Sequence, residues 1–125
     1  MRRGVVLAVL LVSGCGAAAP AATSTGVVLT EGAITVGHSD LASGRVRLEI
    51  ENSGQYDHTL VITTDAGVVI AATGLITAGD ATALVVELSP GGYQFSCRIV
   101  ATGEDGAVLD HYQLGMKADV RVRSG

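Results

Sequence analysis

The feature that most constrains this chain is a succession of short runs of Val, Ile, Leu and Thr, each ended by Gly, Asp, Asn or Ser. Such runs, spaced by turn-forming residues, are typical of β-strands. No stretch combines the apolar period of a helix with capping residues, so we expect an all-β chain. Seven or eight strands are predicted, with candidates at residues 27–30, 33–36, 45–51, 58–63, 67–72, 82–88, 92–97 and 118–123.

Composition limits the chain to one folded unit of this kind. With 125 residues it has room for one domain, and its 48% of hydrophobic residues exclude an intrinsically disordered coil. Only 3% of the residues are aromatic, so aliphatic side chains must fill the core. A net charge of −4 and the lack of a Lys/Arg cluster beyond the N-terminus argue against binding to nucleic acid. A single β-sandwich or β-barrel is therefore expected.

Strand parity indicates which side chains face the core, because alternate residues of a strand point to the same side of its sheet. His58 therefore shares a face with Leu60 and Ile62, and Cys97 shares a face with Phe95. We expect His58 and Cys97 each to lie at the end of an apolar face and to point toward the core.

The N-terminus has the pattern of an export signal. Two arginines follow the first residue, an apolar run covers residues 4–12, and small residues then lead to Cys15. The apolar run is shorter than the roughly 20 residues that a membrane-spanning helix needs. We therefore interpret residues 1–14 as a secretory signal peptide. Residues 11–15, Leu-Val-Ser-Gly-Cys, resemble the lipobox of bacterial lipoproteins, in which the Cys becomes the lipidated first residue.

On this interpretation Cys15 carries lipid, residues 15–25 form a flexible tether and residues 26–125 form the folded domain. The protein is then exported to the cell envelope and held on the outer side of a bacterial membrane by its lipid anchor alone. Removal of the signal leaves six basic residues against 12 acidic ones, a net charge of −6. The alternative is a plain signal peptide followed by an incidental Cys.

Four side chains of the predicted domain offer a set of copper ligands. The domain contains one Cys, Cys97, and one Met, Met116, together with His58, His111 and His38. A thiolate, two imidazoles and a weak axial thioether form a type 1 copper site. Met116 follows His111 by five positions, just before the last predicted strand, whereas His38 matches no ligand position.

Four motifs surround these residues. Residues 52–62 read Asn-Ser-Gly-Gln-Tyr-Asp-His-Thr-Leu-Val-Ile, and residues 78–80 read Ala-Gly-Asp and open a strand. Residues 90–97 read Pro-Gly-Gly-Tyr-Gln-Phe-Ser-Cys, and residues 111–116 read His-Tyr-Gln-Leu-Gly-Met. Over roughly residues 26–123 the chain resembles the cupredoxin family, the plastocyanin- and azurin-like blue copper proteins.

The resemblance implies a Greek-key β-sandwich that holds one copper ion at one end and cycles it between Cu(II) and Cu(I). One ligand, His58, would come from an internal strand, and the loop between the last two strands would supply the others. His58, Cys97 and His111 would then be the equatorial ligands and Met116 the axial ligand.

The chain departs from the family pattern at two places. Thirteen residues, 98–110, separate Cys97 from His111, where the family usually has only a few. Glu104-Asp105-Gly106 in this insert is a turn sequence, so we expect a small hairpin that returns the chain to the site. The family often has Asn after the first His; here Thr59 stands there, and its hydroxyl can make a weaker link to the thiolate loop.

The resemblance implies an electron carrier, with His111 as the exit for the electron. The sequence offers no open coordination position or acid/base pair for chemistry on a substrate, so we do not expect an enzyme. Redox proteins are the expected partners, basic surfaces are favoured by the negative net charge, and the protein is expected to be a monomer. Two alternative functions remain open. In the first, the same ligands hold copper for delivery to an acceptor, without electron transfer. In the second, the protein binds no metal and is a β-sandwich lipoprotein that interacts with a partner. Zinc also accepts a Cys/His₂ set, although copper is bound more tightly.

Overall fold

A computed structural model describes residues 20–124, which form eleven strands. The strands are β1 (Ser24–Thr30), β2 (Ala33–Val36), β3 (Asp40–Ala42), β4 (Gly44–Asn52), β5 (Val61–Thr64), β6 (Val69–Ala72), β7 (Ala81–Leu88), β8 (Gly91–Ser96), β9 (Val100–Thr102), β10 (Val108–Asp110) and β11 (Lys117–Arg123). Within these residues no helix is long and apolar enough to cross a membrane. The predicted lipidation site, Cys15, lies outside the described residues.

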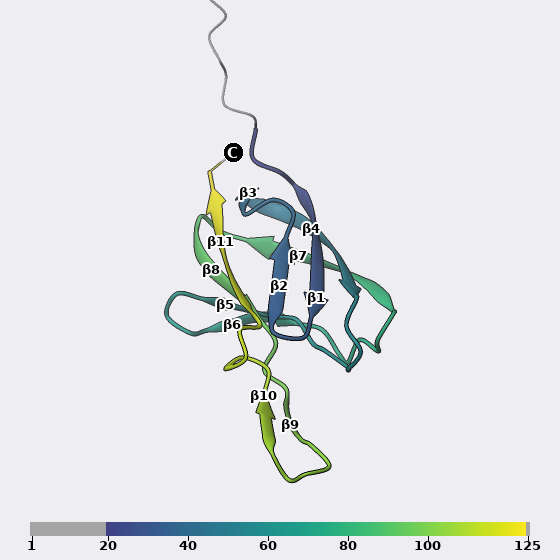
Figure 1. Ribbon diagram of the computed structural model, residues 1–125. Helices are drawn as coiled ribbons and strands as arrows, with labels where there is room; N and C mark the ends of the chain where they lie inside the picture. Colours follow the sequence, from purple (N-terminus) through teal and green to yellow (C-terminus); the bar gives the residue numbers. More distant parts are fainter. Residues whose placement is uncertain (1–19, 125) are drawn as a thin grey trace, which may run out of the picture.

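The strands form two sheets that face one another, plus a separate hairpin (Figure 1). One sheet has the order β2-β1-β4-β7 and the other has the order β3-β11-β8-β5-β6. The β1–β4 and β3–β11 pairs are parallel, and the other pairs are antiparallel. The predicted all-β sandwich is confirmed, but it has more strands than the seven or eight expected.

The differences from the predicted strands have local causes. β3 has only three residues, so it gives no alternating pattern, and it is held by parallel pairing with β11. His58 makes only an isolated bridge with Ile76, and the regular strand begins later, at β5. At the N-terminal end β1 begins at Ser24, with Thr25 already buried, two residues before the boundary expected at 26.

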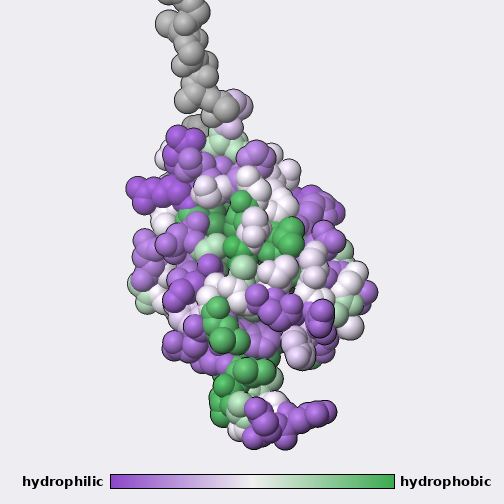
Figure 2. All heavy atoms as spheres, in the orientation of Figure 1, coloured by the Kyte–Doolittle hydropathy of each residue, from purple (hydrophilic) through white to green (hydrophobic). Residues whose placement is uncertain are grey.

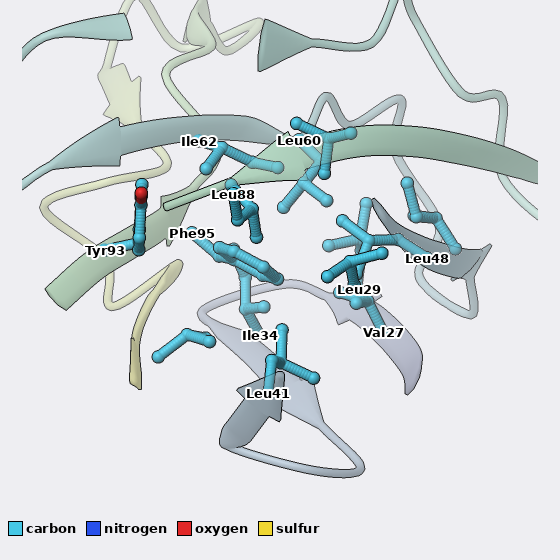
Figure 3. Packing of buried hydrophobic residues seen from close by; sticks show 14 of the residues in the cluster. Val27, Leu29, Ile34, Leu41, Leu48, Leu60, Ile62, Leu88, Tyr93 and Phe95 are labelled. Atoms are coloured by element: carbon cyan, nitrogen blue, oxygen red, sulfur yellow. The ribbon is translucent and has the colours of Figure 1, made fainter. Parts of the chain in front are cut away.

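The core lies between the two sheets and is mostly aliphatic. Figure 3 shows the ring of Phe95 among side chains from both sheets, with Leu88 and Ile34 from one and Ile62 from the other. The predicted inward orientation of His58 and Cys97 is confirmed, because both are fully buried together with Leu60, Ile62 and Phe95. His58 and Cys97 therefore lie in the interior, next to the aliphatic core.

The insert before His111 forms the expected hairpin. β9 and β10 are antiparallel, with Val100 opposite Asp110 and Thr102 opposite Val108. Its turn depends on Gly106, which has a φ of +79°, a conformation that favours glycine. The hairpin projects from one end of the sandwich, opposite the end where the described chain begins (Figure 1).

Candidate metal centre

Three donor atoms from distant parts of the chain converge beside the base of this hairpin. His58 lies just before β5, Cys97 directly after β8, and His111 directly after β10. The two Nδ1 atoms of His58 and His111 are 3.1 Å apart. Cys97 Sγ lies 3.9 Å from Nδ1 of His58 and 3.6 Å from Nδ1 of His111. All three side chains are buried, so the cluster is shielded from water.

These distances fit one shared metal ion. Nitrogen and sulfur ligands bond to a metal such as zinc at about 2.0–2.3 Å, so two ligand atoms on one ion lie roughly 3–4 Å apart. The three measured separations fall within this range. One soft sulfur with two imidazole nitrogens is also the donor set of a blue copper site. The residues present therefore fit the copper ion that the sequence predicts.

Met116 lies next to this cluster. Its side chain is fully buried, and it lines a cavity of about 70 Å³ together with His58 and His111. The backbone holds it there, because Met116 N–H donates to the carbonyl of His111 and Cys97 N–H donates to the carbonyl of Met116. The fourth predicted ligand is thus beside the other three.

The hairpin explains how a long insert preserves the site. His111 N–H donates to the carbonyl of Ile99 at 3.0 Å, which continues the pairing of β9 and β10 toward the sandwich. His111 therefore returns to a point two residues beyond Cys97, and the inserted residues project outward. The chain then turns through Gly115, where φ is +109° and a Cβ would lie 2.6 Å from the Gly32 carbonyl oxygen.

Thr59 approaches the thiol of Cys97, whereas His38 lies apart from the cluster. Thr59 Oγ1 is 3.8 Å from Cys97 Sγ, within hydrogen-bonding distance for sulfur. His38 is exposed and is not part of the cluster, and its backbone N–H donates to Thr25.

Glu31 is a contact of the site that the sequence analysis missed. It lies in the turn between β1 and β2, and its Oε1 is 3.3 Å from Nε2 of His58. Desolvation acts to raise the pKa of the Glu31 carboxyl. Hydrogen bonds from the N–H groups of Gln55, Glu31 itself and Tyr56, and from the His58 ring, outweigh it and lower the pKa to about 2. Glu31 is therefore ionised at neutral pH.

His111 is held in the form that binds metal. Desolvation lowers its pKa below the usual value, and His58 adds to this effect, while Glu31 and Asp110 act in the opposite direction. A metal binds the neutral imidazole, so a lowered pKa reduces competition from protons.

Asn52 organises the loop that leads to His58. Its side chain is fully buried and donates to the carbonyls of Tyr56 and Ile76, both at 2.8 Å. Its Oδ1 accepts from Gly54 N–H at 2.9 Å. Asn52 of the Asn-Ser-Gly motif thus makes buried and partly buried hydrogen bonds that fix the loop leading to His58.

Comparison with known families identifies the domain type. Residues 4–109 match the family model described as a cupredoxin-like domain. The match includes His58 and Cys97 and ends before His111 and Met116, so the case for these two residues as ligands rests on the structure and the motif. Among curated proteins, no sequence matches the chain.

Solved structures share the fold at low sequence identity. Auracyanin of the photosynthetic bacterium Roseiflexus castenholzii aligns with a TM-score of 0.64 and 21% identity, over 83% of this chain and 99% of its own. Rusticyanin of Thiobacillus ferrooxidans aligns with a TM-score of 0.59 and 19% identity, over 82% of this chain and 79% of its own. A multicopper oxidase also aligns, with a TM-score of 0.52 and 17% identity, over 81% of this chain but 42% of the oxidase.

Proposed function

Because the chain belongs to the family of cupredoxin-like domains, we propose that it is a type 1 copper protein that carries single electrons. His58, Cys97 and His111 are the equatorial ligands in this proposal, and Met116 is the axial ligand. The observation that carries it is the convergence of one thiol and two imidazoles, with donor atoms 3.1–3.9 Å apart, in a buried site.

The chain is built to hold these ligands in one arrangement. A copper ion, when bound, would supply one-electron exchange between Cu(II) and Cu(I). His58 is fixed by two backbone hydrogen bonds with Ile76, at 2.8 and 3.1 Å. Cys97 and Met116 are tied to each other through the backbone, as described above. Ligands fixed in this way need little rearrangement between the two charge states, which favours fast electron transfer over chemistry on a substrate.

His111 is the ligand placed to exchange electrons with a partner. It is 7% exposed and lines a cleft of about 790 Å³ between the hairpin and the loop at residues 55–57. The charged residues of this cleft are all acidic: Asp57, Glu104 and Asp105. Exposed Val100 and Val108 lie on the hairpin, and Figure 2 shows apolar surface there beside a hydrophilic tip. We propose that partners with a basic rim around an apolar contact dock here.

Reversing the charge of the hairpin tip is expected to slow electron transfer to a basic partner. With a basic c-type cytochrome as the probe, Glu104→Lys/Asp105→Lys should lower the second-order rate by about tenfold at low ionic strength. The difference should disappear near 1 M salt, because exposed charges are then screened. Stopped-flow absorption measures both rates.

The matched control is Asp40→Lys/Asp65→Lys, which changes the net charge equally on a separate groove. It should change the rate by no more than roughly twofold. Equal effects from the two double variants would show that net charge, rather than this cleft, guides the partner.

A copper carrier is the second candidate, favoured by the adjacent cavity and the long loop between two ligands. Voltammetry of the copper-loaded protein in the presence of a Cu(I) chelator separates the two functions. The electron carrier gives a reversible one-electron wave that persists over many cycles. A wave that decays as copper passes to the chelator would favour the carrier.

We extend the proposal to the location of the protein. If Cys15 is the lipidated first residue, Pro20 follows it by five positions, a span of at most about 18 Å. The described chain begins at the end of the sandwich opposite the hairpin (Figure 1). An anchored protein would then present the metal end away from the membrane, toward partners in the cell envelope. The mass of the mature N-terminal peptide tests the acylation of Cys15 directly.

A further inference from the structure

The carboxylate of Glu31 meets the candidate metal ligand His58 from the side opposite the cluster. His58 directs Nδ1 toward Cys97 and His111 and presents Nε2 to Glu31 Oε1 at 3.3 Å. If Nδ1 binds the metal, the neutral ring carries its proton on Nε2. That N–H then donates to the carboxylate, and the hydrogen bond selects the tautomer that leaves Nδ1 free.

Glu31 is itself held in place by the loop that precedes His58. Its Oε1 accepts hydrogen bonds from Gln55 N–H at 2.7 Å and from Tyr56 N–H at 3.0 Å. Gly54 lies so close that a Cβ there would collide with the same oxygen. Three donors therefore converge on one carboxylate oxygen, which fixes its position relative to the ring.

The same turn also touches the other end of the ligand loop. A Cβ at Gly32 would lie 3.1 Å from the carbonyl oxygen of Leu114, so the two backbones are in close contact. Glu31 and Gly32 thus connect the segment before His58 with the segment before Met116. Glu31, His58 and Met116 line the same small cavity.

Charge distinguishes Glu31 from a neutral hydrogen-bond acceptor. The His58 ring is fully buried, which strengthens its electrostatic interactions, whereas the Glu31 side chain is 42% exposed, so water screens part of its charge. A fixed negative charge favours the more positive of two oxidation states. It also makes the imidazole a better donor to metal. Both effects favour Cu(II) over Cu(I).

We propose that Glu31 is a positioning residue that fixes the tautomer of His58 and lowers the reduction potential of the copper site through its negative charge. This proposal rests on the proposed copper function. The competing explanation is that Glu31 only ties the β1–β2 turn to residues 55 and 56. The two differ in what happens when the charge is removed but the shape is kept.

The test compares Glu31→Gln with Glu87→Gln in the copper-loaded protein. Gln keeps an acceptor oxygen for the backbone donors, and Glu87 is an exposed residue on β7 that offers the same change in charge. In a redox buffer at fixed potential, Glu31→Gln should shift the Cu(II)/Cu(I) ratio at least tenfold toward Cu(I), about 59 mV for one electron. Cu(II) affinity should fall about 10- to 100-fold. Glu87→Gln should change the ratio less than about twofold.

A second readout needs no copper. Nitrogen-15 NMR of the metal-free wild type should show His58 protonated on Nε2, and Glu31→Ala should lose this preference. Thermal unfolding of each variant identifies any that fail to fold. Equal potentials for the two Gln variants, or an unchanged tautomer in Glu31→Ala, would overturn the role of Glu31. Failure of the wild type to bind copper would instead contradict the proposed function, and with it the effect of Glu31 on the reduction potential. The NMR measurement would still test the hydrogen bond between Glu31 and His58.

Discussion

Replacing Cys97 by Ser is expected to abolish the intense blue absorption of the copper-loaded protein while leaving the fold intact. The band of a type 1 site comes from the copper–thiolate bond, which a hydroxyl cannot replace. Cys97 is fully buried directly after β8, and Ser is close to Cys in size, so the packing around it should be kept. The hydrogen bond from its backbone N–H to the carbonyl of Met116 does not involve the side chain and should also be kept. Visible absorption and EPR spectra of both proteins measure the change.

His38→Ala is the matched control for removal of a potential ligand. His38 is exposed and outside the cluster, so this variant should keep the full intensity of the wild-type band. A band that survives in Cys97→Ser would show that another residue supplies the charge-transfer ligand. A band lost in His38→Ala would contradict the ligand set.

Replacing Phe95 by Ala is expected to lower the free energy of unfolding by about 3–5 kcal/mol. This is a large share of the roughly 5–15 kcal/mol that stabilises a typical domain. Phe95 is fully buried between the sheets and packs against side chains from both (Figure 3). Because aromatic residues make up only 3% of the chain, few other large side chains can fill the space. Urea denaturation of the metal-free protein measures the change.

Val85→Ala is the control, since Val85 lies on β7 but is 43% exposed rather than buried. This substitution should lower the free energy of unfolding by less than about 1 kcal/mol, which is the range of β-strand propensities. Similar losses from the two substitutions would mean that the sandwich does not depend on the packing seen around Phe95. Phe95 also lies two residues before Cys97, and both side chains are buried, so its loss should weaken copper binding as well.

Much of the fold could be predicted because apolar and polar residues alternate along the longer strands, and this alternation shows which face of each strand is buried. In β4 the buried Val46, Leu48 and Ile50 alternate with exposed charged residues, and one face of the sheet is thereby defined. β3 escaped prediction because three residues carry no period, and its order depends on pairing with β11. The hairpin of β9 and β10 was predicted from its turn residues, since its strands are too short to be recognised alone.

The site was predictable to the extent that its residue types are scarce. One Cys and one Met in the folded part, with two well-spaced histidines, leave few possible ligand sets, and strand parity points His58 and Cys97 inward. Glu31 could not be found in this way. It is one acidic residue in a turn, and its contact with His58 spans 27 positions of the sequence. That contact depends on how the β1–β2 turn packs against residues 54–56, which no local pattern encodes.

Titration of the purified protein with Cu(II), followed by visible absorption and EPR, tests the central claim most directly. We expect an intense blue band that saturates at one copper per chain, with the EPR signal of a thiolate-bound type 1 centre, and both signals should disappear on reduction. A colourless protein at full copper occupancy, or a tightly held zinc ion that copper does not displace, would contradict it.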